Sequence, residues 1–463
     1  MKFINGNKID PTRVIIIAVI VLSLLIIAYA YWRSENYNID RSHEYVKLYY
    51  IGGFLALFWA GIFFLEKHDR LKTLMVFTSI LFGTYTIEIV LASVSYRPLE
   101  RSVIAEQNGV SFDKRSKLQV YGDLIKAGEN AVPLTQPSGL IVTNGIPNSP
   151  LIDGHNLFPL GTISDAEVVV SNETGKWMIF HSDRYGFNNP DDSLWDNKKI
   201  DILLVGDSFT QGVAMQDGED IAGRIREKTN SSVINLGNSG NGPLLELATL
   251  MEYSDIVKPK SIFWIYYEGN DLYGGLRNEL NSPLLRNYLL SEFSQNLKNK
   301  QEEIDRFLNG YVFEKHMKGV RRSQQKENFE SNKLTLAFRI IKLFHLRSTI
   351  GFNNIGNRID DIDVFYKIMS LAKNKAESYG GEMHFVYLPE YRRYNKNFVN
   401  HNEYKNKKEI IDLIKGMGIK VIDIHKDVFL KLDDPNTLFP FGINGHFNSK
   451  GYSLVADRIM SNL

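Results

Sequence analysis

The sequence of 463 residues contains no cysteine. Disulfide bonds, thiolate nucleophiles and thiolate metal sites are therefore excluded, whereas reducing and oxidising compartments fit the sequence equally well. The sequence also lacks an excess of charge of either sign, because its formal net charge is only +1. This balance gives no argument for a nucleic-acid partner. The histidines and aspartates do not fall at the spacing of metal ligands, and no glycine-rich run has the spacing of a phosphate cradle. We therefore expect neither a metal nor another cofactor.

Long apolar runs are concentrated at the N-terminus, where residues 14–32, 49–65 and 73–96 each come close to the roughly 20 residues that cross a bilayer. A signal peptide has a shorter apolar region and is not followed by two further runs. The sequence thus predicts a membrane anchor over residues 1–97 with three transmembrane helices. Within the third run lies Glu88, a charge in a costly position. It is read either as a contact with a partner protein or polar cavity, or as a protonated or snorkelling residue.

The cations that flank these runs give the orientation. Lys2, Lys8 and Arg13 precede the first run, and Lys67, Arg70 and Lys72 lie in the short loop before the third. This distribution favours an N-terminus inside the cell, which places everything after Tyr96 outside the cytoplasm.

The rest of the chain falls into two parts. Residues 98–198 are rich in Gly, Pro and Asn and are predicted to form a connecting or cap segment. From residue 199 to 463, continuous apolar strands alternate with helices, which predicts an α/β domain whose parallel sheet is covered on both faces. A charged helical insert is expected at about 278–338. The predicted strands are 202–205, 233–236, 261–267, 383–388 and 420–424, and the predicted helices are 219–228, 244–253, 360–378, 407–417 and 449–460.

Four residues at strand ends or near the C-terminus supply what acyl transfer at a serine requires. Ser208, in Gly-Asp-Ser after the first strand, is a candidate nucleophile, and His446, just before the last helix, is a candidate base. Gly240 lies in the glycine-rich loop after the second strand, where its N–H can approach a substrate. Asn270, after the third strand, can donate its side-chain amide to an oxyanion. Each residue alone is a weak signal, but together and in this order they point to a serine-based active site.

These blocks, Gly206-Asp207-Ser208, Gly240, Gly269-Asn270-Asp271 and His446, resemble those of the SGNH hydrolases, a branch of the GDSL esterases. The resemblance covers about residues 199–463. It implies a flavodoxin-like three-layer α/β/α fold, with Ser208 as nucleophile and His446 as base. It also implies an oxyanion hole made by the N–H groups of Ser208 and Gly240 and the side chain of Asn270.

The sequence departs from the family at Asn444, because the family usually carries an aspartate two or three residues before the histidine. An amide cannot stabilise the imidazolium, and the equivalent change in a serine protease costs about 10⁴-fold in turnover. Three interpretations follow. Asn444 accepts a hydrogen bond from the imidazole in a slower catalytic pair, or another carboxylate such as Asp433 or Asp434 completes the triad, or the domain binds without catalysing.

The anchor and the resemblance together predict a function. Extracytoplasmic domains of this kind resemble bacterial exopolysaccharide O-acetylation proteins of the alginate-acetylation type. We therefore expect a multi-pass protein of the bacterial cytoplasmic membrane, a serine esterase or O-acyltransferase acting on cell-surface polysaccharide. A separate membrane acyl donor is the expected partner, at a contact that includes Glu88. The alternatives are a lipase or thioesterase at the membrane surface and a non-catalytic polysaccharide-binding or assembly protein. Trp177, Tyr185, Trp264 and Tyr267 are candidates to stack on a sugar ring, with core packing the favoured role for Trp264, which lies inside a predicted strand.

Overall fold

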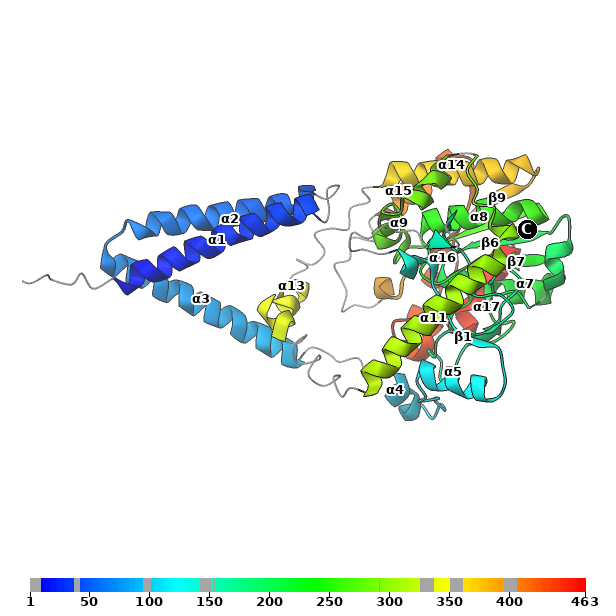
Figure 1. Cartoon of the computed structure of the whole chain (residues 1–463), viewed down its shortest axis with the longest axis horizontal. Helices are drawn as coiled ribbons and strands as arrows, with labels where there is room; N and C mark the ends of the chain where they lie inside the picture. Colours follow the sequence, from blue (N-terminus) through cyan, green and yellow to red (C-terminus); the bar gives the residue numbers. More distant parts are fainter. Residues whose placement is uncertain are drawn as a thin grey trace, which may run out of the picture. The chain divides into compact units, whose positions relative to one another are not determined.

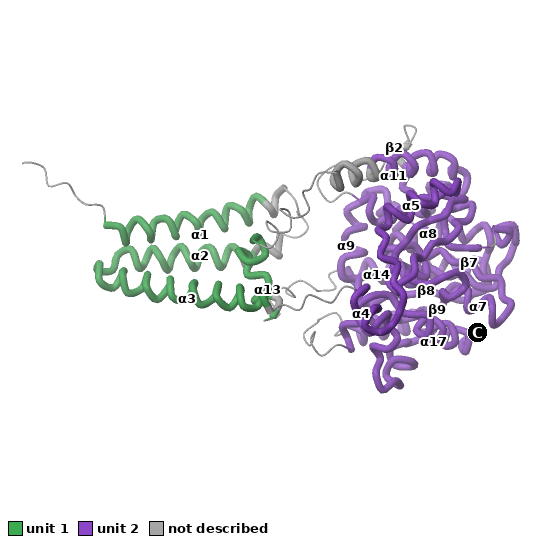
Figure 2. The backbone as a smooth tube through the Cα atoms, turned by 90° about the horizontal axis from the view of Figure 1, so that it is seen from below, with its two compact units in different colours: residues 1–97, 328–356 green, residues 98–327, 357–463 purple. Residues whose placement is uncertain are grey.

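The computed structural model describes residues 10–36, 42–94, 101–141, 151–152, 155–190, 192–290, 292–324, 337–349, 361–394 and 406–463. The chain forms two compact units, coloured separately in Figure 2. The first contains residues 1–97 and 328–356, and the second contains residues 98–327 and 357–463. The segment 98–198 therefore belongs to the same unit as the predicted catalytic domain, and part of the sequence after the charged insert belongs to the unit of the predicted anchor.

A five-stranded parallel sheet forms the centre of the second unit. Its strands are β6 (Ile202–Gly206), β7 (Val233–Asn235), β8 (Ser261–Tyr267), β9 (Glu382–Leu388) and β10 (Lys420–Asp423). They are hydrogen-bonded in the order β10-β9-β8-β6-β7. Numbered along the chain, this is the order 2-1-3-4-5 of flavodoxin-like folds, in which ligands bind where the strand order reverses. That position lies between β6 and β8, at their carboxyl ends.

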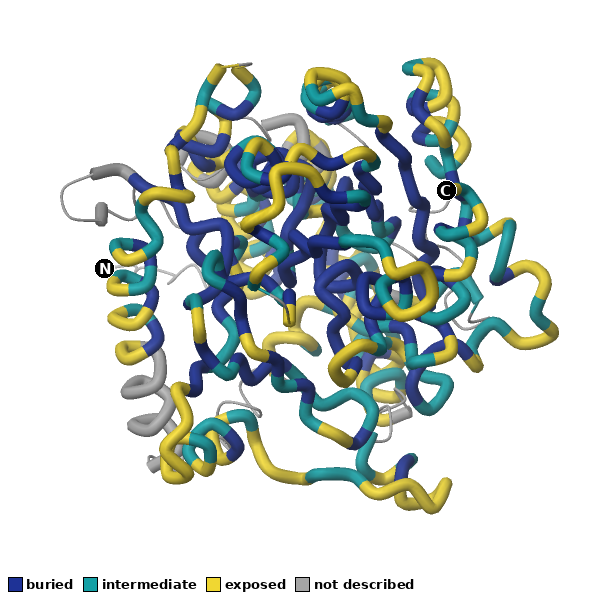
Figure 3. The backbone as a smooth tube through the Cα atoms, turned by 90° about the vertical axis from the view of Figure 1, so that its right-hand side faces the viewer, coloured by how far each residue is buried: buried dark blue, intermediate teal, exposed yellow. Residues whose placement is uncertain are grey.

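Helices cover both faces of this sheet. α7 (Ile221–Thr229) packs against the C-terminal helix α17 (Ser449–Met460), and α8 (Pro243–Val257) packs against α14 (Ile362–Ser378), which also contacts α15 (Lys407–Gly416). The strands β6, β7 and the middle of β8 are buried throughout because they have helices above and below. Figure 3 shows these buried segments in the interior and the exposed ones around the rim. The predicted α/β fold with a parallel sheet is confirmed.

The segment before the sheet builds a smaller one. β4 (Glu167–Val169) pairs in parallel with β1 (Ala131–Pro133) and antiparallel with β5 (Ile179–His181). A two-residue pair, β2 (Leu151–Ile152) with β3 (His155–Asn156), also lies here. Its short helices are α4 (Arg101–Gln107), α5 (Lys117–Lys126), η2 (Pro137–Leu140) and η3 (Asp192–Asp196). Val168, Phe180 and Phe187 are buried in the same hydrophobic cluster as the main sheet, so the segment is an integral part of the catalytic unit.

Short helices and one long helix follow β8. The short ones are η4 (Asp271–Gly275), α9 (Leu276–Glu279), α10 (Pro283–Arg286), η5 (Asn287–Leu289) and η6 (Leu297–Asn299). The long one is α11 (Gln301–Gln324). The expected helical insert is thus helical over these residues. Later short helices are η8 (Tyr391–Tyr394), α16 (Ile424–Asp427), η11 (Phe429–Lys431), η12 (Pro435–Leu438) and η13 (Pro440–Gly442).

The first unit contains α1 (Pro11–Asn36), α2 (Ser42–Phe63), α3 (Lys67–Val94) and the short α13 (Phe344–Thr349). α1 and α2 lie side by side along their length, whereas α3 diverges from them (Figure 1). Among the described residues, two stretches are long and apolar enough to cross a membrane, Pro11–Trp32 and Lys67–Ser93, and only 17% and 6% of their most apolar windows are buried. Two of the three predicted spans therefore meet this criterion of length and composition. α2 begins with polar residues, so its apolar part, Leu48–Phe63, is shorter.

A buried arginine ties the start of α1 to the turn between α2 and α3. The guanidinium of Arg70 forms an ion pair with Asp10 at 2.6 Å and donates to the hydroxyl of Thr12 at 3.2 Å. It also donates to the backbone carbonyls of Phe63 and Leu65. Arg70 is only 4% exposed, and a buried charge needs partners. The Asp10 carboxylate and the three oxygen acceptors supply them.

Glu88 of α3 is fully buried against α13. Its carboxylate accepts hydrogen bonds from the backbone N–H of His345 at 3.0 Å, from Nδ1 of His345 at 2.8 Å and from the backbone N–H of Leu346 at 2.7 Å. A carboxylate at a helix N-terminus satisfies backbone donors that have no partner inside the helix. Glu88 therefore binds a segment of its own chain, which neither sequence interpretation of Glu88 foresaw.

Candidate active site

Ser208 lies two residues after the end of strand β6, as the first residue of the short helix α6 (Ser208–Gln211). The preceding residue, Asp207, caps this helix, because its carboxylate accepts the backbone N–H of Phe209 at 2.9 Å. A second Asp207 oxygen accepts the side-chain amide of Asn270 at 3.3 Å. Burial raises the pKa of Asp207. These contacts fix the turn that presents the Ser208 hydroxyl at the carboxyl end of the sheet.

His446 lies on the loop before α17, and its ring contacts the serine. Nε2 of His446 is 2.8 Å from Oγ of Ser208, within hydrogen-bond distance of a proton that it can accept. The ring packs on Phe209, with 4.8 Å between the two ring centroids. Asn448 caps α17 by accepting the backbone N–H of Gly451 at 3.0 Å, which fixes the loop on its C-terminal side. Ser208 and His446, far apart in the sequence, are thus placed as a nucleophile and its base.

The third partner is Glu173, in the turn after β4. Its Oε1 is 2.9 Å from Nδ1 of His446, and its Oε2 accepts the backbone N–H of His446 at 2.9 Å. The two bonds fix both the ring and the backbone that carries it. With the Ser208 contact on Nε2, the imidazole is bracketed by a hydroxyl and a carboxylate, which is the geometry of a Ser-His-acid triad.

This arrangement differs from the expectation at Asn444. The structure places Nδ1 of His446 against Glu173, and the contact described for Asn444 is made by its backbone carbonyl, which accepts from Arg101 at 2.7 Å. The alternatives Asp433 and Asp434 are not the partner either, because Asp434 instead accepts the backbone N–H of Asn436 at 3.0 Å at the start of η12. A carboxylate does complete the site, but it comes from the segment that the sequence assigned to a cap.

Two features let the Glu173 carboxylate stay ionised at this position. Arg101 lies 3.3 Å from its Oε2. Gly445 leaves room for it, since a Cβ at this position would lie 2.5 Å from Oε2 of Glu173 and 2.5 Å from the Arg101 guanidinium. Burial alone would raise the pKa of Glu173, but the hydrogen bonds from His446 and the positive charges of His446 and Arg101 outweigh it and lower the pKa to about 2.

Gly240 and Asn270 lie at the same end of the sheet, after β7 and β8. Gly240 has φ +80°, and a Cβ on it would lie 2.5 Å from Oγ of Ser138, so both the backbone conformation and the space require glycine. Its backbone N–H has no acceptor among the hydrogen bonds of the described residues. Asn270 has two amide N–H groups, one of which bonds Asp207. The structure thus brings together all three groups predicted to form an oxyanion hole.

These residues share one cavity of about 480 Å³. It is lined by the catalytic groups Ser208, Glu173 and His446, by Gly240 and Asn270, and by further residues of mixed character: Lys117, Leu134, Gln136, Val170, Ser171, Phe209, Val213, Ser239, Tyr267, Asn444 and Gly445. Tyr267 is therefore at the site, whereas Trp177 lines a neighbouring cavity with Arg101. In the described part of the chain, no group of three His, Asp or Glu side chains is arranged to hold a metal ion.

The geometry is suited to ester chemistry. In such a reaction, Oγ of Ser208 would attack a carbonyl carbon while Nε2 of His446 accepts its proton, and Glu173 would stabilise the imidazolium that forms. Gly240 and Asn270 lie where they can donate to the developing oxyanion. The imidazolium would then protonate the departing alcohol, which leaves an acyl-serine. Water or a second hydroxyl, deprotonated by His446, would attack this intermediate and regenerate the serine.

The protein was also compared with protein families, curated proteins and solved structures. No protein-family model matches the sequence, and no curated protein matches it. Among solved structures, the chain is similar to a member of the lipolytic protein G-D-S-L family from Veillonella parvula, with 13% identity, coverage of 56% of this chain and 96% of that chain, and a TM-score of 0.31. It is also similar to a protein assigned to the G-D-S-L lipolytic family from Desulfitobacterium hafniense, with 15% identity, coverage of 58% and 100%, and a TM-score of 0.30. The functional argument rests on the site itself.

Proposed function

We propose that this protein is a membrane-anchored serine esterase or O-acyltransferase, with acetyl as the acyl group, that acts on cell-surface polysaccharide outside the cytoplasm. The observation that carries the proposal is the chain of contacts from Ser208 through His446 to Glu173, in a cavity that also contains Gly240 and Asn270. Such a set supplies a nucleophile, a base, a carboxylate for the base and oxyanion donors. Ester bonds are its natural substrate class.

Glu173 also bears on the non-catalytic alternative. That alternative was motivated by the amide at Asn444, which cannot support an imidazolium. With a carboxylate 2.9 Å from Nδ1 of His446, the motive no longer applies. We therefore favour catalysis over a purely binding role.

The first unit supports attachment to a membrane. The most apolar windows of its two long apolar stretches are only 17% and 6% buried, unlike the core helices of a water-soluble domain, and leave large side chains such as Leu22 and Phe82 exposed. Such a surface is stable in lipid. In this proposal α1, α2 and α3 each cross the cytoplasmic membrane of a bacterium, because Arg70 at the start of α3 pairs with Asp10 at the start of α1, and α2 must therefore lead the chain back across the bilayer. With the N-terminus inside, three crossings leave the catalytic unit on the outer side.

The lining of the cavity favours a sugar over an acyl chain as the larger part of the substrate. Gln136, Ser171, Ser239 and Asn444 give it hydrogen-bonding groups beyond those used in the chemistry. A site that accepts polar hydroxyls must offer such partners, because unpaired polar groups are costly to bury. The acyl donor for a transferase would be a separate membrane protein.

Labelling by a fluorophosphonate tests the chemistry first. The full-length protein in detergent micelles is expected to react at Ser208, and Ser208→Ala is expected to abolish the label. Ser171→Ala, which removes a different hydroxyl from the same cavity, should remain labelled. The substrate is tested by comparing acetate release from acetylated oligosaccharides with fatty-acid release from phosphatidylglycerol. Acetate release that depends on Ser208 supports the proposal, and fatty-acid release alone would make the protein a lipase.

A further inference from the structure

Residues 337–349 belong to the first unit, although the chain reaches them only after residues 98–327 of the catalytic unit. They are helical over residues 337–341 and again over α13. The hydroxyl of Tyr85 in α3 donates to the backbone carbonyl of Ile341 at 3.2 Å, and the Glu88 carboxylate accepts from the backbone of α13. α13 therefore lies beside the second half of α3, as Figure 1 shows. We call residues 337–349 the returning segment.

The place of Glu88 along α3 gives the depth of this contact in a bilayer. The apolar stretch Lys67–Ser93 has 27 residues, and at about 1.5 Å per residue it is about 40 Å long, the thickness of the hydrocarbon core with its two polar borders. Glu88 precedes Ser93 by about 8 Å along the helix axis. In the proposed orientation, this is the level at which acyl chains meet the headgroups of the outer leaflet. The returning segment, which binds Glu88, lies at the same level.

Three large apolar side chains of the returning segment are exposed to a large extent. Phe338, Ile341 and Phe344 are 57%, 62% and 42% exposed. On α3, Phe82 lies one turn before Tyr85 on the same face of the helix, and it is exposed as well. Because Tyr85 contacts the returning segment, the apolar surface of the segment continues that of α3. A continuous apolar surface of this kind is unfavourable in water and stable in lipid.

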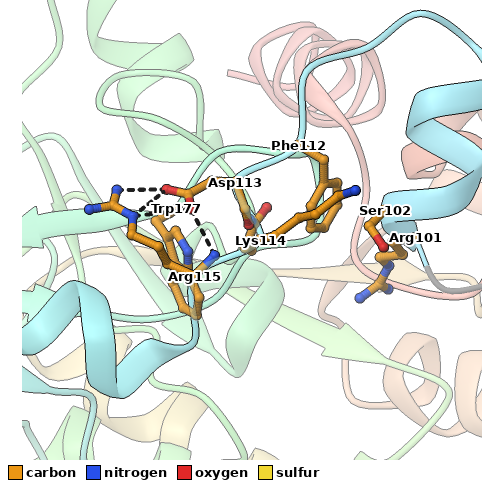
Figure 4. A pocket seen from close by; sticks show the side chains of 8 residues that line it. Arg101, Ser102, Phe112, Asp113, Lys114, Arg115 and Trp177 are labelled. Atoms are coloured by element: carbon orange, nitrogen blue, oxygen red, sulfur yellow. Dashed lines mark hydrogen bonds and ion pairs between the residues drawn. The ribbon is translucent and has the colours of Figure 1, made fainter.

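The returning segment also carries three cations and no acidic residue. The cations are Arg339, Lys342 and Arg347, and all three are exposed. Within the part of the chain that the structure describes, none of them forms an ion pair. Exposed cations of the catalytic unit do have carboxylate partners, as Arg115 has Asp113 at 2.6 Å (Figure 4). Unpaired cations beside an apolar surface are typical of helices that lie in the interface of an anionic membrane.

We propose that the returning segment lies in the outer leaflet of the membrane and binds the headgroups of anionic phospholipids. Its three exposed apolar side chains lie among the acyl chains, and its three cations donate charge-assisted hydrogen bonds to phosphate oxygens. This inference rests on the membrane attachment in the proposed function and adds a lipid partner. It also gives the chain a second attachment, so that residues 98–327 of the catalytic unit are joined to the membrane at both ends.

Because the chain has no cysteine, one introduced cysteine reports the surroundings of a single position. The full-length protein carries a nitroxide at Ile341→Cys in nanodiscs of phosphatidylcholine and phosphatidylglycerol. Collisions of the nitroxide with oxygen, which dissolves in lipid, are compared with collisions with a water-soluble nickel chelate. Oxygen should be favoured at Ile341→Cys and at Phe82→Cys in α3. The nickel chelate should be favoured at Leu430→Cys, an exposed position of the catalytic unit.

Each other result of this experiment has a definite meaning. If Phe82→Cys reports lipid but the nickel chelate is favoured at Ile341→Cys, the segment lies in water and the inference is overturned. Low access of both reagents to Ile341→Cys would place the segment against a protein and would overturn the inference as well. Preference for the nickel chelate at Phe82→Cys would instead reject the membrane attachment in the proposed function.

Hydrogen exchange tests the recognition of headgroup charge. A peptide covering residues 337–349 should exchange more slowly in nanodiscs that contain phosphatidylglycerol than in nanodiscs of phosphatidylcholine alone. Lys342→Gln should make this exchange about fivefold faster with phosphatidylglycerol, the effect of one cation at an anionic surface, and should change it little without. Lys415→Gln, at an exposed lysine of α15, is the matched control and should have no effect in either lipid. Equal exchange of the wild type in both lipids, or an equal effect of Lys342→Gln in both, would overturn the inference.

Discussion

Gly445 and Glu173 are in such close contact that a Cβ on Gly445 would lie 2.5 Å from Oε2 of Glu173. The carboxylate that supports His446 therefore reaches it only because the preceding residue has no side chain. Replacing Gly445 by alanine should push Glu173 and Arg101 away from the imidazole.

We expect Gly445→Ala to lower kcat for 4-nitrophenyl acetate by about 10- to 100-fold, since misplacement of a catalytic group by about 1 Å has effects of this size. Steady-state kinetics of the purified full-length protein measure it. Gly416→Ala, at a glycine of α15 with nothing within 4 Å of the added Cβ, is the matched control and should leave kcat unchanged. Equal kcat in Gly445→Ala and wild type would show that Glu173 does not need this space.

Asn270 should matter for the transition state more than for substrate binding. Asn270→Ala is expected to lower kcat by about 10²- to 10³-fold with little change in KM, which is the cost of removing one oxyanion donor. Both constants follow from the same kinetic experiment. A rise in KM with an unchanged kcat would instead assign Asn270 to ground-state binding.

The pH dependence of stability should report the ionised Glu173. Its folded-state pKa is lowered from 4.5 to about 2, so the carboxylate stabilises the fold above the unfolded pKa, and this contribution is lost as the pH falls from about 5 towards 2. The melting temperature of Glu173→Gln should therefore lie below that of wild type at pH 7, and the difference should shrink through this window. Thermal unfolding of both proteins at several pH values measures it, and a difference independent of pH would contradict the assignment.

Glu88 should hold α13 on α3. Glu88→Gln weakens the acceptor for the backbone N–H groups of His345 and Leu346, and we expect hydrogen exchange in a peptide covering residues 337–349 to become at least about tenfold faster. Mass spectrometry of the exchanged protein in detergent micelles gives this rate. Glu66→Gln, at an exposed residue of the same unit, is the control. Unchanged protection of the peptide in Glu88→Gln would mean that the carboxylate does not hold α13.

The sheet could be predicted from the sequence because its strands are short apolar runs with helices between them. The predicted strand 261–267 matches β8, and the other four predicted strands begin or end within one or two residues of the observed ones. The apolar pattern of a fully buried parallel strand is independent of long-range detail. The bounds of the apolar helices in the first unit were harder to predict, because α2 mixes polar and apolar residues in its first turns.

The candidate site could be predicted only where each residue follows a strand or precedes a helix. Ser208, Gly240, Asn270 and His446 satisfy that condition, and they meet because parallel strands end at one edge. Glu173 also follows a strand, but that strand, β4, belongs to a different, smaller sheet, so the topology of the parallel sheet does not bring it to His446. No local pattern links the two residues, although two signs existed: a carboxylate three residues after the apolar run 168–170, and a glycine directly before the histidine.

The most direct test compares Glu173→Gln with Asn444→Ala. Because the third member of the triad is Glu173, its conversion to an amide should lower kcat for 4-nitrophenyl acetate by about 10⁴-fold, as the corresponding change does in a serine protease. Asn444 contacts Arg101 only through its backbone carbonyl, so Asn444→Ala should retain kcat within about threefold of wild type. A large loss in Asn444→Ala together with near-normal turnover in Glu173→Gln would contradict the assignment of Glu173 to His446.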